Sequence, residues 1–306
     1  MTTSTQAPPP VTSRLPRTAP NAPHAKKAPA SARFRTALYA VIGTVVSMLF
    51  VAPVLWSVLR SLQLGAQIAG PAAGQSFTDL SLENYIGLVN NIGAGSYIWN
   101  SLTIALGSAV LSVVITTLAA YALVNFPFRG SNVAFALILL TMMVPFQAIL
   151  TPLFLEMNAL GLTDSLAGII VFHLTFNLPF GVFLMRNSFA QIPAEVVEAA
   201  RIDGAGPLRI LLSVLRPMIV PGVVTVFLFA FLGAWGDFLG ALTFLTRQEL
   251  FTLPVAVENV ASGAFGTVNY GYVIAGAVLL MLPCLILYAA VQRYYVRGLV
   301  AGAVKG

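Results

Sequence analysis

Residues 191–209 of the chain read QIPAEVVEAARIDGAGPLR, a short polar stretch between two long apolar runs at about 165–186 and 209–235. Pro193 suits the first turn of a helix, where its missing N–H costs nothing, and Gly204 suits the left-handed residue that ends one. The charged residues between them follow the helix dipole, with acids early and a base late: Glu195, Glu198 and Arg201. The stretch therefore predicts a short helix ended by a tight turn.

The surface of this predicted helix is small. Ala199 and Ala200 would let another protein's backbone approach closely, and Glu198 and Arg201 are three residues apart, so they share a face. A rigid helix of low bulk is suited to docking against a partner. An ordinary helical connection between two apolar segments is the alternative that these residues leave open.

The composition of the whole chain is that of a membrane protein. Of its 306 residues, 58% are hydrophobic and only 8% are charged, with a mean hydropathy of +0.87. A soluble domain carries about 25% charged residues, so this chain cannot cover a water-facing surface. The net charge of +6 does not indicate nucleic acid as a partner, because the basic residues lie between apolar runs. The single cysteine, Cys284, excludes an intrachain disulfide.

Six stretches are long enough to cross a bilayer as helices, which takes about 20 apolar residues each. They lie at about 36–59, 98–124, 132–155, 165–186, 209–235 and 270–292. The first is too long for the apolar part of a cleaved signal peptide. The predicted fold class is an all-α membrane protein with six transmembrane helices.

Basic residues set the predicted orientation. With the N-terminus inside, 14 of the 16 Lys and Arg residues fall on the cytoplasmic side, and only Arg60 and Arg247 fall outside. The opposite orientation would invert this ratio against the positive-inside rule. Both termini are therefore predicted to be cytoplasmic.

The chain divides by composition into a tail and a transmembrane domain. Residues 1–32 are rich in Pro, Ala, Ser and Thr without apolar periodicity, which predicts a disordered cytoplasmic tail. Its Lys26 and Lys27 either contact anionic membrane lipid or only anchor the first span. Residues 33–306 form the predicted six-helix domain, with a core at about 97–293, the cytoplasmic loop at 187–208 and outer loops at 61–97 and 236–269.

Several motifs, in their order along the chain, resemble one family. Glu198-Ala199-Ala200, with Gly204 six positions and Pro217 nineteen positions after the Glu, is similar to the EAA motif of binding-protein-dependent ABC importer permeases. The sugar-importer branch, of the maltose-permease type, is the most similar. Further motifs support the resemblance: Asn100-Ser101-Leu102, AWGDFL at 234–239, TLPV at 252–255 and the ending at 293–306.

The resemblance implies a type I ABC importer permease fold in a bacterial or archaeal cell membrane, and a coupling helix within residues 193–207 that seats in the ATPase. The residues expected to couple are Glu195, Glu198, Ala199, Ala200, Arg201, Asp203 and Gly204. It also implies three kinds of partner: a second homologous permease, an ABC ATPase dimer and an extracytoplasmic sugar-binding protein. ATP and Mg would be bound by the ATPase and not by this chain.

Polar residues within the spans are candidates for the translocation path. Pro179 frees a backbone carbonyl inside the fourth span, and such groups are tolerated at membrane depth only where protein, water or ligand satisfies them. A kink stabilised by packing between helices is the alternative. The path candidates are Asn100, Phe176, Asn177, Trp235 and Asp237. His173 stands alone in the same span, where a neutral ring bonded to a neighbouring helix is favoured over a functional group.

The sequence offers no catalytic chemistry of its own. It contains no GxxxxGK[ST] phosphate loop, no cluster of metal ligands and no nucleophile with its base. Together with the resemblance, which implies a carbohydrate-transporting permease subunit, this predicts a chain without an ATP site, a cofactor or a metal. An ion-coupled secondary transporter or channel is the alternative, although its spans would be expected to carry more acidic residues and an inverted repeat.

Overall fold

The computed structural model describes residues 30–63, 80–126 and 128–303, and it describes their side chains except at 30–33, 36 and 293–303. Three predicted segments therefore lie partly outside the described residues: the tail 1–32, the loop 61–97 and the ending 293–306. The chain forms two units that divide after Pro53, inside the first helix.

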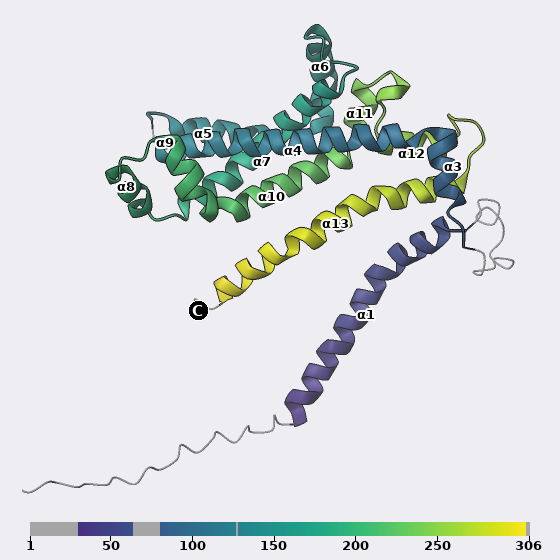
Figure 1. Ribbon diagram of the computed structural model, residues 1–306, viewed down its shortest axis with the longest axis horizontal. Coiled ribbons are helices and arrows are strands. Elements are labelled where there is room, and N and C mark those ends of the chain that lie inside the picture. Colours follow the sequence, from purple (N-terminus) through teal and green to yellow (C-terminus); the bar gives the residue numbers. More distant parts are fainter. Residues whose placement is uncertain (1–29, 64–79, 127, 304–306) are drawn as a thin grey trace, which may run out of the picture. The chain divides into compact units, whose positions relative to one another are not determined.

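The described residues form helices joined by short connections (Figure 1). The long helices are α1 (Ala30–Ser61), α4 (Ala94–Asn125), α7 (Leu166–Ala190), α10 (Arg216–Trp235) and α13 (Tyr270–Ala303). The shorter ones are α3 (Glu83–Ile92), α5 (Ser131–Leu140), η2 (Thr141–Met143), α6 (Phe146–Ala159), α8 (Ala194–Ile202), α9 (Pro207–Arg209), η3 (Ile210–Leu215), α11 (Leu239–Phe244), η4 (Gln248–Leu250) and α12 (Leu253–Ala261).

Five helical segments are long and apolar enough to cross a membrane: Ala37–Ser61, Ala94–Asn125, Leu166–Ala190, Pro207–Trp235 and Tyr270–Gln292. They coincide with five of the six predicted spans. Large apolar side chains remain exposed along them, as at Leu49 (72% exposed) and Phe50 (73%) of α1. An exposed apolar surface of this extent is typical of contact with lipid or with another protein.

The stretch predicted as a span at 132–155 is not one continuous helix. The chain there forms α5 with η2 and then α6, and the two parts meet at an angle of 104°. Pro145 explains the break, because it has no N–H to donate and forces Val144 out of the helical conformation, to φ −81° and ψ 119°. The pair makes a sixth candidate span only if the two parts are counted as one bent span.

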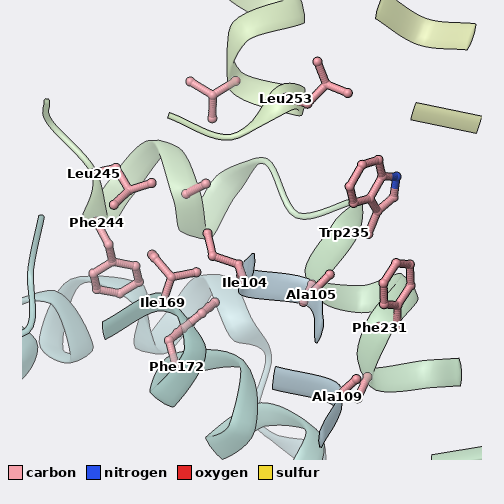
Figure 2. Packing of buried hydrophobic residues seen from close by; sticks show 14 of the residues in the cluster. Ile104, Ala105, Ala109, Ile169, Phe172, Phe231, Trp235, Phe244, Leu245 and Leu253 are labelled. Carbon is pink, nitrogen blue, oxygen red and sulfur yellow. The ribbon is translucent and has the colours of Figure 1, made fainter. Parts of the chain in front are cut away.

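The core of the second unit is built from α4, α7 and α10, which pack against one another. Small residues allow this close approach, since a side chain on Gly107 of α4 would collide with Ile170 of α7. One large apolar cluster lies where these helices meet α11 and α12, and Figure 2 shows Ile104 and Ala105 of α4 among its members. Gly271 and Gly276 are also tightly packed, against Asn84 and Val257.

The start of the fifth span contains a widened turn. Residues Ile210–Leu215 form the π-helical segment η3, which joins α9 to α10. Pro217 accounts for it, because a proline cannot donate the next α-type hydrogen bond to the carbonyl four residues earlier. Arg216 closes the segment by donating its N–H to the Leu211 carbonyl.

The connection between α7 and α10 and the connection between α10 and α13 lie at opposite ends of this core (Figure 1). One end carries α8 and is called here the α8 end. The other carries α3, α11 and α12 and is called the α11 end. The loop predicted at 236–269 is thus largely helical, with α11, η4 and α12 in it.

Candidate functional site

The helix at the α8 end, α8, is short and has a hydrogen-bonded C-terminal cap. Gly204 has φ 74°, the left-handed conformation that glycine adopts without strain. Its N–H donates to the Arg201 carbonyl at 3.0 Å, and the N–H of Ala205 donates to the Ala200 carbonyl at 3.0 Å. These two bonds make a Schellman motif, so the predicted glycine cap is confirmed. Pro193 stands at the N-cap, one position before the helix begins.

One face of α8 packs on the core and the rest is free of it. Ala200 is 8% exposed and contacts a cluster that includes Tyr121, Phe189 and Leu215. The other residues predicted to couple are exposed: Glu195, Glu198, Ala199, Arg201, Asp203 and Gly204. Ile202 next to them is 86% exposed, although it is apolar. The structure therefore brings the predicted coupling residues together on one small, accessible helix.

Arg201 ties α8 to the core. Its guanidinium donates to the carbonyl of Asn125, at the end of α4, at 3.3 Å. Arg201 and Glu198 also line the same pocket of about 260 Å³ between α8 and the ends of α4 and α7. The prediction that these two residues share a face is confirmed. Few directional bonds hold α8 itself, so its position depends mainly on the packing of Ala200 and Val197 against this cluster.

At the α11 end, α4 holds the segment around η4 through two neighbouring side chains. The Asn100 amide donates to the carbonyls of Glu249 (2.8 Å) and Phe251 (3.0 Å), and the Ser101 hydroxyl accepts from the N–H of Leu253 at 2.8 Å. Both amide hydrogens of Asn100 are used in this way. The motif at 100–102 therefore contacts the motif at 252–255, which the sequence alone did not reveal.

Trp235 and Asp237 anchor the corner after α10 in two directions. Trp235 is 2% exposed, and its indole N–H donates to the carbonyl of Leu280 in α13 at 2.8 Å. The Asp237 carboxylate accepts from the N–H groups of Gly240 and Ala241, both at 3.1 Å, and so caps α11.

His173 of α7 is the partner of Asp237 across this corner. Its Nε2 lies 3.4 Å from Asp237 Oδ2, with the two side chains 7% and 16% exposed. The distance suits an ion pair, but the angles are not those of a hydrogen bond, and Nε2 has no other partner among the described residues. The favoured interpretation of His173, a neutral ring bonded to a neighbouring helix, stays a prediction: the ring lies beside Asp237, in the corner between α10 and α11, without a hydrogen bond at Nε2 among the described residues.

The remaining path candidates lie on α7. Phe176 packs edge-on against Phe146 with ring centroids 5.1 Å apart. The Asn177 amide donates to the His173 carbonyl at 2.8 Å, within its own helix. Asn100, Trp235 and Asp237 each bind a different part of the chain, whereas Trp235 and Phe176 belong to the same apolar cluster.

A charged clamp, which sequence reasoning missed, lies beside α11. Asp164 Oδ1 accepts from the N–H groups of Thr246 and Arg247, both at 3.0 Å, and Oδ2 accepts from the Arg247 guanidinium at 2.7 Å. These bonds lower the pKa of Asp164 to about 2. The backbone hydrogen bond from Arg247 has the largest effect, and the one from Thr246 the next largest. No spacing signals this pair, since 83 residues separate its members.

Comparison with a protein-family model decides the identity of the fold. Residues 112–300 match the model of the binding-protein-dependent transport system inner membrane component. The chain belongs to this family. Its members are the permease subunits of ABC transporters, so the match agrees with the resemblance carried by the motifs.

Curated relatives cover nearly the whole chain. The trehalose transport system permease protein SugB of Mycobacterium tuberculosis is 33% identical over 89% of this chain and 98% of its own length. The arabinooligosaccharides transport system permease protein AraQ of Bacillus subtilis is 31% identical over 85% of this chain and 92% of its own length.

A solved structure has the same fold. The crystal structure of a bacterial ABC transporter involved in the import of the acidic polysaccharide alginate contains a chain that aligns with a TM-score of 0.74 and 26% identity. The alignment covers 87% of this chain and 98% of that chain. The fold is therefore that of an ABC importer permease.

Proposed function

We propose that this chain is one permease subunit of an ATP-driven ABC importer that moves a carbohydrate into the cytoplasm. The observation that carries the proposal is α8, an exposed helix whose Schellman cap and small face fit the coupling helix of the family. Relatives named for trehalose and arabinooligosaccharide transport favour a carbohydrate as the substrate.

The proposed topology has six spans with both termini in the cytoplasm. It counts α5 and α6 as one bent span. The α8 end then faces the cytoplasm and the α11 end faces outward, in agreement with the distribution of 14 basic residues against 2. The proposed localisation is the cell membrane of a bacterium or an archaeon.

The proposed mechanism transmits force through α8. Closure of the ATPase dimer on ATP would pull α8 inward and open the path outward, and hydrolysis would reset it. Glu198 would pair with a basic residue of the ATPase, while Ala199 and Gly204 keep the contact surface low. A second homologous permease supplies the other half of the path, and a sugar-binding protein docks at the α11 end. ATP and Mg are bound by the ATPase.

Within this scheme the five path candidates remain proposals. Asn177 and Phe176 would face the sugar on α7, close to Pro179 inside the same helix. Asn100, Trp235 and Asp237 bind other parts of this chain in the present conformation, so they would reach the path only after these bonds rearrange.

An ion-coupled secondary transporter or channel is the competing function. Such a protein needs ionisable groups deep in its spans. In the described spans such groups are few, and His173 is the buried one, with Asp237 beside it just after the fifth span. Uptake that needs ATP and survives collapse of the ion gradients would exclude this alternative.

The first experiment is affinity purification from the native membrane in mild detergent, followed by mass spectrometry of the proteins that co-elute. We expect a second permease, an ABC ATPase and a solute-binding protein. Recovery of this chain alone, or as a homo-oligomer without an ATPase, would refute the proposal. As a control, an α8 variant with Glu198→Lys should insert normally but recover less ATPase.

A further inference from the structure

A second pocket lies at the α11 end, away from every path candidate. It has a volume of about 230 Å³ and is formed where α3, the turn after α12 and the start of α13 meet. Its lining residues are Asn91, Ile92, Val260, Phe265, Thr267, Asn269 and Tyr272. None of these seven described residues carries a charge, whereas two carboxamides, two hydroxyls and an aromatic ring face one space.

The walls of the pocket are held in place by the fold. A side chain on Gly87 of α3 would collide with the Tyr272 phenol, so the ring lies directly against the helix. The turn after α12 is fixed by two left-handed glycines, Gly263 (φ 76°) and Gly266 (φ 118°), and by a bond from the Gly266 N–H to the Gly263 carbonyl at 3.0 Å. This turn carries Phe265 to the rim, where it is half-buried.

The polar groups of the pocket are oriented but not saturated. The Asn91 amide donates to the Tyr272 hydroxyl at 2.9 Å, which leaves the phenol proton free to donate. Asn269 uses Oδ1 to accept from the Tyr272 N–H at 3.2 Å, which leaves its two N–H donors. The Thr267 hydroxyl has no protein partner among the described residues. The pocket thus presents donors and acceptors at fixed positions.

We infer that this pocket is a binding subsite for one ring of a neutral carbohydrate, on the outer side of the permease. A sugar ring offers hydroxyls to the carboxamides and hydroxyls of the pocket, and its C–H face to Phe265. The pocket is smaller than the about 300–1,000 Å³ of sites for drug-sized ligands, so it takes a single ring. Without a basic group it discriminates against carboxylated sugars. The inference rests on the proposed function and narrows its substrate to uncharged sugars.

The test measures sugar binding by the full-length chain in lipid nanodiscs, by saturation-transfer NMR with trehalose and maltose as neutral probes and glucuronate as the charged probe. We expect signal transfer to the neutral sugars and not to glucuronate. Phe265→Leu should weaken binding about threefold to tenfold, since an aromatic contact contributes about 0.5–1.5 kcal/mol. Asn269→Ala and Tyr272→Phe should each weaken it about fivefold, the value of one hydrogen bond. Tyr270→Phe, at an exposed ring outside the lining, is the matched control.

Three outcomes would overturn the inference: equal signal in wild type and Phe265→Leu, equal signal for glucuronate, or variants that weaken docking of the co-purified solute-binding protein while sugar binding is unchanged. The last result would make the pocket a protein contact. Failure of the importer proposal is distinguishable, because co-purification tests the partners and the nanodisc experiment needs none of them.

Discussion

The segment Asp237–Leu253 and the loop that carries α8 both leave the same three-helix core, but they are attached to it by different means. Directional polar bonds hold the first: Asn100 and Ser101 bind it from α4, and Asp164 binds it from the start of α7. The α8 loop is instead bonded mainly within itself. It meets the core through apolar packing of Ala200 and Val197 and through two bonds with α4, from the Tyr121 hydroxyl to the Pro207 carbonyl and from Arg201 to the Asn125 carbonyl.

This difference separates two kinds of polar residue. At the α11 end, polar side chains satisfy backbone groups, so changing them should cost stability. At the α8 end, the charged side chains are exposed and make few hydrogen bonds to backbone groups. Substituting them should therefore reduce function and leave the fold intact. Each prediction below tests one side of this contrast.

The largest effect is expected at α8. Glu198→Lys should abolish uptake of the transported sugar and weaken assembly with the ATPase, because it reverses the charge at the proposed contact while the exposed side chain supports nothing in the fold. Uptake assays with quantified membrane insertion check this, and Glu198→Gln, which keeps the shape, should retain part of the activity. Uptake at the wild-type rate by Glu198→Lys would refute the proposed coupling role of Glu198.

At the other end, Asn100→Leu should destabilise the protein by about 1–3 kcal/mol, because it leaves two carbonyls without their donor in a buried place. Thermal unfolding in detergent measures this. Thr103→Ala is the control, since that exposed hydroxyl bonds only to the Trp99 carbonyl of its own helix and its loss should change little. Equal melting temperatures of Asn100→Leu and wild type would show that the contacts from α4 do not hold the segment Asp237–Leu253.

The sequence predicted what depends on local patterns. Length and hydropathy located five spans, and the dipole order of charges with Gly204 located α8 and its stop. The bend at Pro145 was not predicted, because a proline inside an apolar run is compatible with a kinked span as well as with a broken one. The bonds of Asn100 and the contact between Asp237 and His173 were not predicted for another reason: those partners lie far away in the sequence, and no spacing rule connects them.

Motifs identified important residues better than they identified roles. Asn100, Trp235 and Asp237 were singled out as path residues, yet in this conformation each binds another element of the chain. A polar residue in a span signals that something must satisfy it, but it does not say whether the partner is a substrate or a backbone carbonyl. Only the tertiary structure distinguishes the two.

The corner after α10 offers a smaller effect. Asp237→Ala should destabilise by about 1 kcal/mol, because it removes the cap of α11 from the N–H groups of Gly240 and Ala241. Asp237→Asn keeps an accepting oxygen and should lose less. Chemical or thermal unfolding of both variants checks the order. If Asn destabilises as much as Ala, the charge facing His173 matters more than the cap.

The smallest effect concerns the pH response of the Asp164 clamp. The pKa of Asp164 falls from 3.8 to about 2 in the folded chain, because the N–H groups of Arg247 and Thr246 and the Arg247 guanidinium favour the ionised carboxylate. An acid whose pKa is lower in the folded than in the unfolded chain stabilises the fold at pH values above its unfolded pKa. This stabilisation is lost as the pH falls through the folded-state pKa. The melting difference between wild type and Asp164→Asn should therefore be constant above about pH 4 and shrink towards pH 2. A difference that already disappears near neutral pH would mean that the backbone bonds to Asp164 do not form, and the α11 end would then be held to the core mainly by Asn100 and Ser101 of α4.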